Sequence, residues 1–154
     1  MNQIISFDNE YAFLSNFYPC TVNAYKSAEA AYQAQKCENP ADREQFTALD
    51  AGPAKRLGRT VKVRPGWDEM RVDVMRDEMR VDVMRDVVHS KFSSHPELAL
   101  QLIATGDAEL IEGNYWHDNF FGNCICPVCA KTPGENWLGK ILMDEREALK
   151  NAKT

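Results

Sequence analysis

The pattern of apolar and polar positions predicts a chain built mainly from helices, with a few short strands. Helix-forming stretches occupy residues 27–36, 40–51, 67–92, 96–104 and 137–150, and β-like stretches occupy residues 3–7, 20–26 and 60–64. Strands carry a period of about two residues and helices one of about 3.6, so we separate them by period and propensity. Residues 113–136 show little periodicity and predict an irregular loop. We expect a helix-rich α+β protein.

Capping and breaking residues place the ends of these elements. Ser27 is a favourable N-cap for the Ala-rich helix that follows it, and Pro40 can occupy the first position of the next helix. Pro53, preceded by a glycine, is expected to end that second helix. Pro96 opens a further helix, which we expect to end before Thr105.

One segment is a perfect tandem repeat, Asp-Glu-Met-Arg-Val-Asp-Val-Met-Arg at residues 68–76 and again at 77–85. An in-frame duplication is the simplest origin. A helix turns about 100° per residue, so nine residues rotate the second copy by about 180°. Met70 and Val74 would then face one side, and Met79 and Val83 the other. One straight helix cannot bury both stripes, so we expect one copy to bulge or to lengthen the helix into solvent.

Composition places the chain among single-domain globular proteins. The 154 residues suit one domain, which we take to span residues 1–154, and the net charge of −5 argues against a protein that coats nucleic acid. A small basic pocket for one diphosphate remains compatible with that charge. The first eight residues carry no export signal, no stretch reaches the about 20 apolar residues of a membrane span, and the five cysteines are odd in number. We expect a cytoplasmic protein with reduced thiols and no membrane partner.

The first candidate site is a polar face on the helix at residues 27–36. Glu29, Gln33 and Lys36 are spaced i, i+4 and i+7, so they share one helix face. The opposite arc holds small alanines, which would let the helix pack closely and hold that face rigidly. A carboxylate and an amine can divide acid–base work. A solvated ion pair is the alternative that spacing alone leaves open.

Two aromatic-rich loops form the second group of candidates. Glu112, Asn114, Trp116 and Asp118 alternate carboxylates, amides and aromatics in a glycine-bounded stretch. Aromatic faces could stack a base, and a carboxylate could polarise a sugar hydroxyl. Asn16 next to Phe17 has the same character. A packed loop, or an Asn that caps a turn, is the alternative.

Three thiols lie within six residues, at Cys124, Cys126 and Cys129. They could bind zinc with a fourth ligand from Cys20, Cys37 or His117, but structural zinc sites usually show two separated ligand pairs. We therefore expect reduced thiols or a weak metal site that catalysis does not need, and no cofactor.

A series of motifs follows in order along nearly the whole chain. They are Phe13-Leu14-Ser15-Asn16-Phe17, Ser27-x-Glu29, Tyr32-Gln33-Ala34-x-Lys36, Ala54-Lys55-x-Leu57-Gly58-Arg59, Trp67, Val83-Met84, Lys91-Phe92, Thr105-Gly106-Asp107, Glu112, Asp118-x-x-x-Gly122, Gly134-x-Asn136-x-Leu138-Gly139-x-Ile141-Leu142-Met143 and Arg146. This ordered set resembles the NADAR (NAD- and ADP-ribose-associated, YbiA-like) family. Ala30 and Phe121 stand where family members often have His and Trp.

This resemblance implies a YbiA-like fold and hydrolysis of an N-glycosidic bond to ribose. Family activities include removal of ADP-ribose from guanine bases, our first expectation, and cleavage of ribosyl phosphate from riboflavin-pathway intermediates. Such bonds break through an oxocarbenium-like transition state, which a carboxylate stabilises. Glu29 is assigned as that carboxylate, Asp118 as its helper, and Lys36 as an electrostatic partner or an amine nucleophile. The expected substrate contacts are Asn16, Phe17, Gln33, Trp67, Glu112, Asn114 and Trp116.

Two other classes remain open at this stage. The chain could be a non-catalytic module that binds ADP-ribose, or an interaction module stapled by metal at its cysteines. The intact Glu29 favours an enzyme over a binding module. The sequence names neither the substrate, which could be a small molecule or ADP-ribose linked to nucleic acid, nor the oligomeric state.

Overall fold

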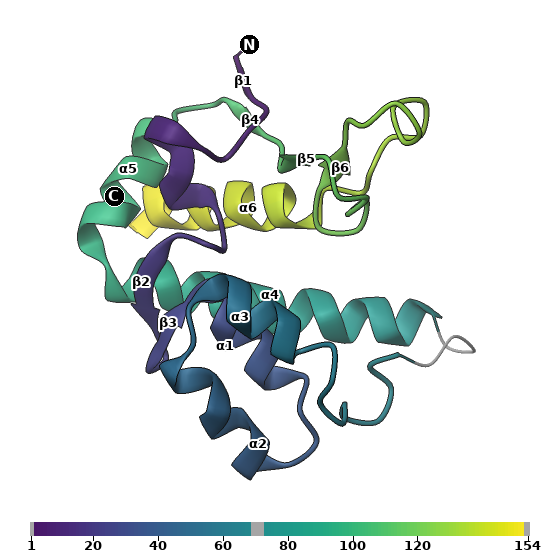
Figure 1. Cartoon of the computed structure of the whole chain (residues 1–154). Helices are drawn as coiled ribbons and strands as arrows, with labels where there is room; N and C mark the ends of the chain where they lie inside the picture. The colour runs from purple at the N-terminus through teal and green to yellow at the C-terminus, as the bar shows by residue number, and fades with distance from the viewer. Residues whose placement is uncertain (1, 69–72, 153–154) are drawn as a thin grey trace. The chain divides into compact units, whose positions relative to one another are not determined.

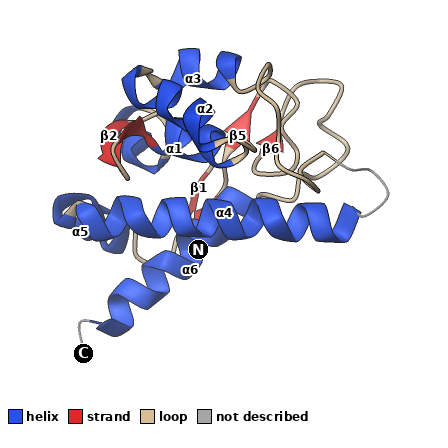
Figure 2. Cartoon of the chain, turned by 90° about the horizontal axis from the view of Figure 1, so that it is seen from below, coloured by secondary structure: helices blue, strands red, loops and turns tan. Residues whose placement is uncertain are grey.

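A computed structural model describes residues 2–68 and 73–152 of the chain. Its helices make up most of the regular structure and its strands are short, which confirms the helix-rich α+β class (Figure 2). The internal contacts divide the chain into two compact units, residues 1–15 with 95–154 and residues 16–94. None of the helices described is both long enough and apolar enough to span a membrane.

The first unit joins the N-terminal residues to the C-terminal third of the chain. Its strands form two parallel pairs, β1 with β4 and β5 with β6, and helix α6 packs on α5 and β4. The helices predicted to begin at Pro96 and Trp137 are confirmed. The elements are β1 (Gln3–Ile4), the 3-10 helix η1 (Asn9–Leu14), α5 (Pro96–Ala104), β4 (Glu109–Leu110), β5 (Gly113–Asn114), β6 (Asn123–Cys124) and α6 (Trp137–Ala152).

The second unit is a β-hairpin followed by helices, with α1 in contact with both α3 and α4 (Figure 1). Seven of the eight residues of α1 are buried, namely its four alanines together with Glu29, Tyr32 and Gln33. The elements are β2 (Pro19–Val22), β3 (Tyr25–Ser27), α1 (Ala28–Gln35), α2 (Pro40–Glu44), the 3-10 helix η2 (Gln45–Ala48), α3 (Ala51–Leu57) and α4 (Asp73–Ser94).

The start of α1 follows the capping prediction. The Ser27 hydroxyl accepts a hydrogen bond from the backbone N–H of Ala30 at 3.0 Å, which satisfies one of the unpaired N–H groups of the first turn. The single strand predicted over 20–26 is wrong, because β2 and β3 are separated by a tight turn. Asn23 and Ala24 form that turn with φ of 52° and 74°. Two positive φ angles suit a hairpin turn, but alanine there is not a sequence signal for one.

Two further boundaries differ from the prediction. Pro53 does not end a helix but lies in the first turn of α3, where the missing N–H has no helical partner to lose. The preceding helix ends earlier, at Glu44. The strand predicted at 60–64 is reduced to one isolated bridge between Cys37 and Val63.

Small side chains allow α1 to sit at the centre of its unit. Ala30, Ala34 and Ala54 are completely buried and cluster with Cys37 and Phe46. Full burial of a side chain such as that of Phe46 stabilises the fold by about 1.5–3 kcal/mol. Because this cluster occupies one side of α1, its polar side is held in a defined position.

The two copies of the repeat differ in their burial. Helix α4 is described from Asp73, within the first copy, and continues through the second. Met75 and Val74 of the first copy are 65% and 72% exposed, whereas the equivalent of Met75 in the second copy, Met84, is 1% exposed. Of the two predicted alternatives, a bulge or a helix lengthened into solvent, the exposure of Val74 and Met75 within α4 fits the second. Met70 lies outside the described residues.

Candidate active site

The polar face predicted on α1 is buried rather than solvated. The Gln33 side-chain amide donates a hydrogen bond from Nε2 to Glu29 Oε1 at 2.9 Å. Both side chains are nearly enclosed, at 8% and 7% exposure, and Lys36 is half-buried at the end of the helix. An i, i+4 pair that is buried and hydrogen-bonded has a fixed geometry, unlike an exposed one. The solvated-face alternative is therefore ruled out for Glu29 and Gln33.

The Gln33 amide carries an unused acceptor. Its Oε1 is buried and has no hydrogen-bond partner. Leaving such a group unpaired costs about 1–3 kcal/mol, and such atoms in a native fold call for an explanation. Gly58 explains how the amide fits, because a Cβ at that position would lie 2.0 Å from Oε1 and 3.1 Å from Lys36 Cε. This glycine of the Lys55-x-Leu57-Gly58 motif gives the polar face its space.

Lys36 lies in an environment that weakens its charge. Desolvation by burial lowers the pKa of its ammonium group below the ordinary value, and the carboxylates of Asp68 and Glu29 partly oppose that shift. The net lowering means that more neutral amine is present near neutral pH than for an ordinary lysine. The same arrangement makes the ammonium form a better proton donor.

Three residues of this unit that were predicted to contact substrate differ in their exposure and in their contacts. The carbonyl of Asn16 accepts a hydrogen bond from the backbone N–H of Glu29 at 2.9 Å, so Asn16 anchors the start of the helix. Phe17 is 44% exposed, with the Lys55 ammonium 5.7 Å from its ring centre. Trp67 is only 3% exposed and packs against Tyr32 at 5.5 Å between ring centres. The exposed ring of Phe17 can therefore contact a substrate more easily than the buried ring of Trp67 can.

Trp67 is held by an arginine from the second copy of the repeat. Arg80 donates to the Trp67 carbonyl from Nε and Nη2, pairs with Asp68 at 2.6 Å, and lies over the indole ring at 5.5 Å. Sequence reasoning did not single out Arg80, because the identical arginine of the first copy has the same local sequence. Only the packed position of the second copy distinguishes the two.

The predicted residues of the 112–118 loop belong to the first unit and organise one another. Asn114 is 1% exposed; its Oδ1 accepts from the backbone N–H groups of Trp116 and Asp118, and its Nδ2 donates to the Asp118 carbonyl at 2.8 Å. Asp118 Oδ1 accepts from the N–H groups of Phe120 and Phe121. These contacts give Asn114 and Asp118 a role in shaping the loop, and their roles toward substrate remain predictions.

Glu112 and Trp116 complete this loop. Glu112 Oε2 accepts from Asn114 Nδ2 at 3.2 Å, and a Cβ on Gly122 would lie 1.8 Å from the same oxygen. The glycine that closes the Asp118-x-x-x-Gly122 motif is thus required by the close approach of Glu112. Trp116 is 56% exposed, so its indole is available at the surface.

Of the three candidates for a fourth ligand, His117 and not Cys20 or Cys37 lies beside the cysteine cluster. Its ring and the thiols of Cys124, Cys126 and Cys129 all place one ligand atom within 4.8 Å of every other. The expectation of plain thiols or a weak site rested on the absence of a second ligand pair in sequence, and the fold supplies His117 instead.

Lys91 is a buried cation that is not among the predicted site residues. It is 1% exposed in α4, with its ammonium 5.6 Å from the Tyr18 ring centre and 5.4 Å from that of Phe92. Burial lowers its pKa to about 8. Its spacing from the buried Val87 and Val88 follows the helical period, and that pattern could have identified it as an interior residue.

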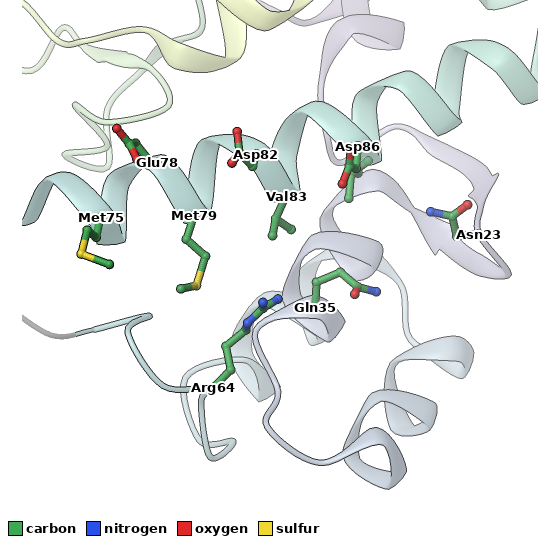
Figure 3. Close-up of a pocket in the computed structure, with 10 residues that line it drawn as sticks. Asn23, Gln35, Arg64, Met75, Glu78, Met79, Asp82, Val83 and Asp86 are labelled. Carbon is green, nitrogen blue, oxygen red and sulfur yellow. The ribbon is translucent and has the colours of Figure 1, made fainter. Parts of the chain in front are cut away.

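A groove of about 640 Å³ runs along α4 but contains none of the predicted site residues. Met75, Met79 and Val83 point into it opposite Arg64 (Figure 3). Its lining carries three carboxylates from α4 against the single guanidinium. An acidic lining repels phosphate groups, so this groove is unsuited to a phosphate-bearing ligand.

Known proteins match this chain along most of its length. The NADAR domain family matches residues 5–150. The N-glycosidase YbiA of Shigella flexneri is 32% identical over 94% of this chain and 85% of its own length, and an N-glycosidase of Nostoc punctiforme is 32% identical over 92% and 87%. A riboflavin biosynthesis protein of Vibrio vulnificus is 37% identical over 92% of this chain, which spans only 36% of that protein.

The fold agrees with a solved relative. The NMR structure of Escherichia coli YbiA superposes with a TM-score of 0.76 at 29% identity, over 99% of this chain and 89% of that one. The fold is therefore YbiA-like, and the relatives that match over most of their length place the chain in the class of N-glycoside hydrolases. The chain belongs to the NADAR family.

Proposed function

We propose that this protein hydrolyses an N-glycosidic bond to ribose, with Glu29 as the essential carboxylate and ADP-ribosylated guanine as its substrate. The observation that carries the proposal is the buried, hydrogen-bonded Glu29–Gln33 pair on α1, with the half-buried Lys36 on the same face. A carboxylate held in place by a neighbouring amide needs little reorganisation when charge develops beside it.

Each group on this face has a task in the reaction. Cleavage develops positive charge at the sugar, which the Glu29 carboxylate stabilises, or it directs the attacking water. Gln33 holds the Glu29 carboxylate through the hydrogen bond from its Nε2, so the carboxylate keeps its position as charge develops at the sugar. Lys36, with its lowered pKa, supplies a proton to the departing nitrogen or a neutral amine toward an opened sugar.

A second substrate has its own support. The riboflavin biosynthesis protein of Vibrio vulnificus, 37% identical to this chain, favours ribosyl-phosphate intermediates of riboflavin synthesis. Both substrates present a ribose carbon bonded to nitrogen and at least one phosphate. The chemistry assigned to α1 is the same for the two, so the choice depends on recognition of the base and of the phosphate groups.

A direct assay separates these substrates. The purified protein is incubated with ADP-ribosylated guanosine and, separately, with the riboflavin intermediates, and released ADP-ribose or ribose phosphate is quantified by chromatography. We expect turnover of the guanosine adduct and loss of more than tenfold in kcat for Glu29→Gln, which is about 1.4 kcal/mol of barrier or more. Glu38→Gln makes the same chemical change at a surface carboxylate paired with Lys62 and should keep full activity.

The outcomes distinguish the alternatives plainly. Turnover of the riboflavin intermediates alone would make them the substrate in place of ADP-ribosylated guanine, and the role of Glu29 would stand. Tight binding of ADP-ribose without turnover of either compound would make the protein a binding module. Retention of more than a tenth of kcat in Glu29→Gln would remove this carboxylate from the mechanism.

A further inference from the structure

The loop between β5 and the start of α6 brings four potential metal ligands together. His117 Nδ1 lies 3.2 Å from Cys129 Sγ, 3.4 Å from Cys126 Sγ and 3.8 Å from Cys124 Sγ. All four ligand atoms lie within 4.8 Å of one another. Bonds of about 2.0–2.3 Å from one central ion to four tetrahedral ligands separate those ligands by distances of this size.

The donor set selects among metals. Three thiolates and one imidazole are soft and borderline ligands, which suit zinc and disfavour magnesium and calcium, the ions that prefer oxygen. Four protein ligands complete a tetrahedron and leave no position for water. Closed sites of this kind are structural, whereas a catalytic zinc keeps an open position.

The surrounding loop buries very little apart from two of these ligands, Cys124 and Cys126, whereas Cys129 is half-buried and His117 is exposed. Over residues 115–135, all of which the structure describes, the buried residues are Gly122, Cys124 and Cys126. Four of its large apolar side chains are exposed, those of Tyr115, Trp116, Ile125 and Val128. Phe120 and Phe121 are half-buried and pack on one another. A loop of this length without an apolar core cannot compensate for the conformational entropy that ordering it costs. An additional constraint is needed, and a metal ion provides one.

The backbone near the ligands also favours a fixed centre. His117 adopts a φ of 66°, in the left-handed region that non-glycine residues enter at a cost unless their surroundings hold them there. The N–H of Cys129 lies 3.4 Å from Cys126 Sγ, and the N–H of Cys124 donates to Asn119 Oδ1 at 2.8 Å. A peptide N–H directed at sulfur stabilises the thiolate that a metal requires.

We propose that His117, Cys124, Cys126 and Cys129 form a structural zinc site that fixes the loop carrying Asp118. His117 directly precedes Asp118, whose backbone is held by Asn114. Zinc binding converts the three thiols to thiolates with release of their protons, and no oxidant or reductant takes part. The inference concerns the stability of this loop and does not rest on the substrate or on the role of Glu29.

Metal content is the first test. The protein is purified under reducing conditions without chelator, and zinc and iron are measured by plasma mass spectrometry. We expect one zinc per chain, and less than a fifth of that in Cys126→Ser and in His117→Ala. Cys20→Ser is the matched control, because Cys20 is a cysteine outside the cluster, and this variant should keep the full zinc equivalent.

Cobalt substitution keeps the test decisive if a variant fails to fold. The wild-type protein, freed of metal and loaded with Co²⁺, should show the intense visible absorption of tetrahedral cobalt together with a sulfur-to-cobalt charge-transfer band. Hydrogen exchange of residues 113–136 should quicken at least tenfold on metal removal and slow again on addition of zinc.

Three results would overturn the proposal. These are a protein without stoichiometric zinc that also gives no tetrahedral cobalt spectrum, a full zinc equivalent in Cys126→Ser, and iron with sulfide absorption in place of zinc. An unchanged exchange rate after removal of bound zinc would refute the assigned role in holding the loop.

Discussion

At the scale of single residues, the candidate site depends on close approaches that only glycine permits. Gly58 faces Gln33 and Lys36, and Gly122 faces Glu112 and Asn114. Both glycines belong to motifs found in sequence, but composition gives no indication of what they approach. Their common function is to let a buried polar side chain lie directly against the backbone.

We predict that Gly58→Ala damages the polar face of α1. Its Cβ would lie 2.0 Å from Gln33 Oε1, so the amide must move and carry its hydrogen bond to Glu29 with it. Overpacking of this kind costs about 1–3 kcal/mol of stability, and we expect kcat to fall at least tenfold. Gly52→Ala, in the helix α3 that Gly58 caps, meets only Arg56 Nη1 at 3.6 Å and serves as the control in melts and assays. Equal behaviour of the two variants would contradict the packing argument.

We predict that the two roles of Asp118 separate with two substitutions. Asp118→Asn keeps an acceptor for the N–H groups of Phe120 and Phe121, so the melting temperature should change little while turnover falls. Asp118→Ala removes the acceptor and should lose about 0.5–2 kcal/mol of stability, the usual cost of such a lost cap. Thermal melts and kcat of both variants provide the check. Full activity in Asp118→Asn would leave Asp118 a structural residue only.

At the scale of elements, two identical nine-residue stretches occupy different environments. Met84 is buried and lies 3.4 Å from Asn16 Nδ2, while Met75 is exposed near the start of α4. Deleting either copy yields the same sequence, since each copy is followed by an equivalent junction. The protein without one copy therefore keeps a buried stripe and loses exposed methionine and valine.

We predict that deletion of residues 77–85 leaves the fold intact and the melting temperature equal or higher. The remaining copy takes over the contacts of the second one, and the exposed apolar side chains of the first disappear. Circular dichroism melts compare the two proteins. A fall of more than a few degrees, on the order of 1 kcal/mol at this size, would show that the first copy has packed partners of its own.

A pair of point variants provides the control for this deletion. Met84→Ala should cost about 2–5 kcal/mol because it empties a buried position. Met75→Ala should remain within about 0.5 kcal/mol, since it alters a side chain that is 65% exposed. Similar losses at the two positions would refute the assignment of the second copy as the packed one.

At the scale of the whole molecule, folding stability includes the cost of a buried cation. The side chain of Lys91, a residue of α4, is buried, and burial lowers its pKa to about 8 from an ordinary value of 10.5. Between these two values the unfolded chain binds the proton and the folded chain does not. Stability must then rise with pH through this window, and the penalty is fully present below about pH 8.

We predict that Lys91→Met flattens this pH dependence. Wild-type protein should gain free energy of unfolding between pH 8 and 10.5, by an amount on the order of 3 kcal/mol, relative to the variant. Guanidinium unfolding at several pH values measures the difference. Parallel curves for the two proteins would mean that Lys91 keeps its proton in the folded state.

The sequence by itself determined the helix-rich α+β class, most helix starts and the family, because caps, prolines and motif order are local properties. It also placed Glu29, Gln33 and Lys36 on one face, since helical spacing needs no tertiary information. It missed the hairpin turn at Asn23 and Ala24, which carries no glycine.

Tertiary structure decided the burial of that face, the position of Arg80 and the convergence of His117 with three thiols. The first two depend on contacts between segments distant in sequence. His117 lies only 7 to 12 residues from the thiols, but the loop must fold back on itself to bring them together, and no local pattern encodes that fold. The repeat is the clearest example of what the sequence alone leaves undetermined. Its two copies have the same propensity and the same chemistry, and only their position relative to the buried side of α1 makes Met84 part of the core and leaves Met75 in solvent.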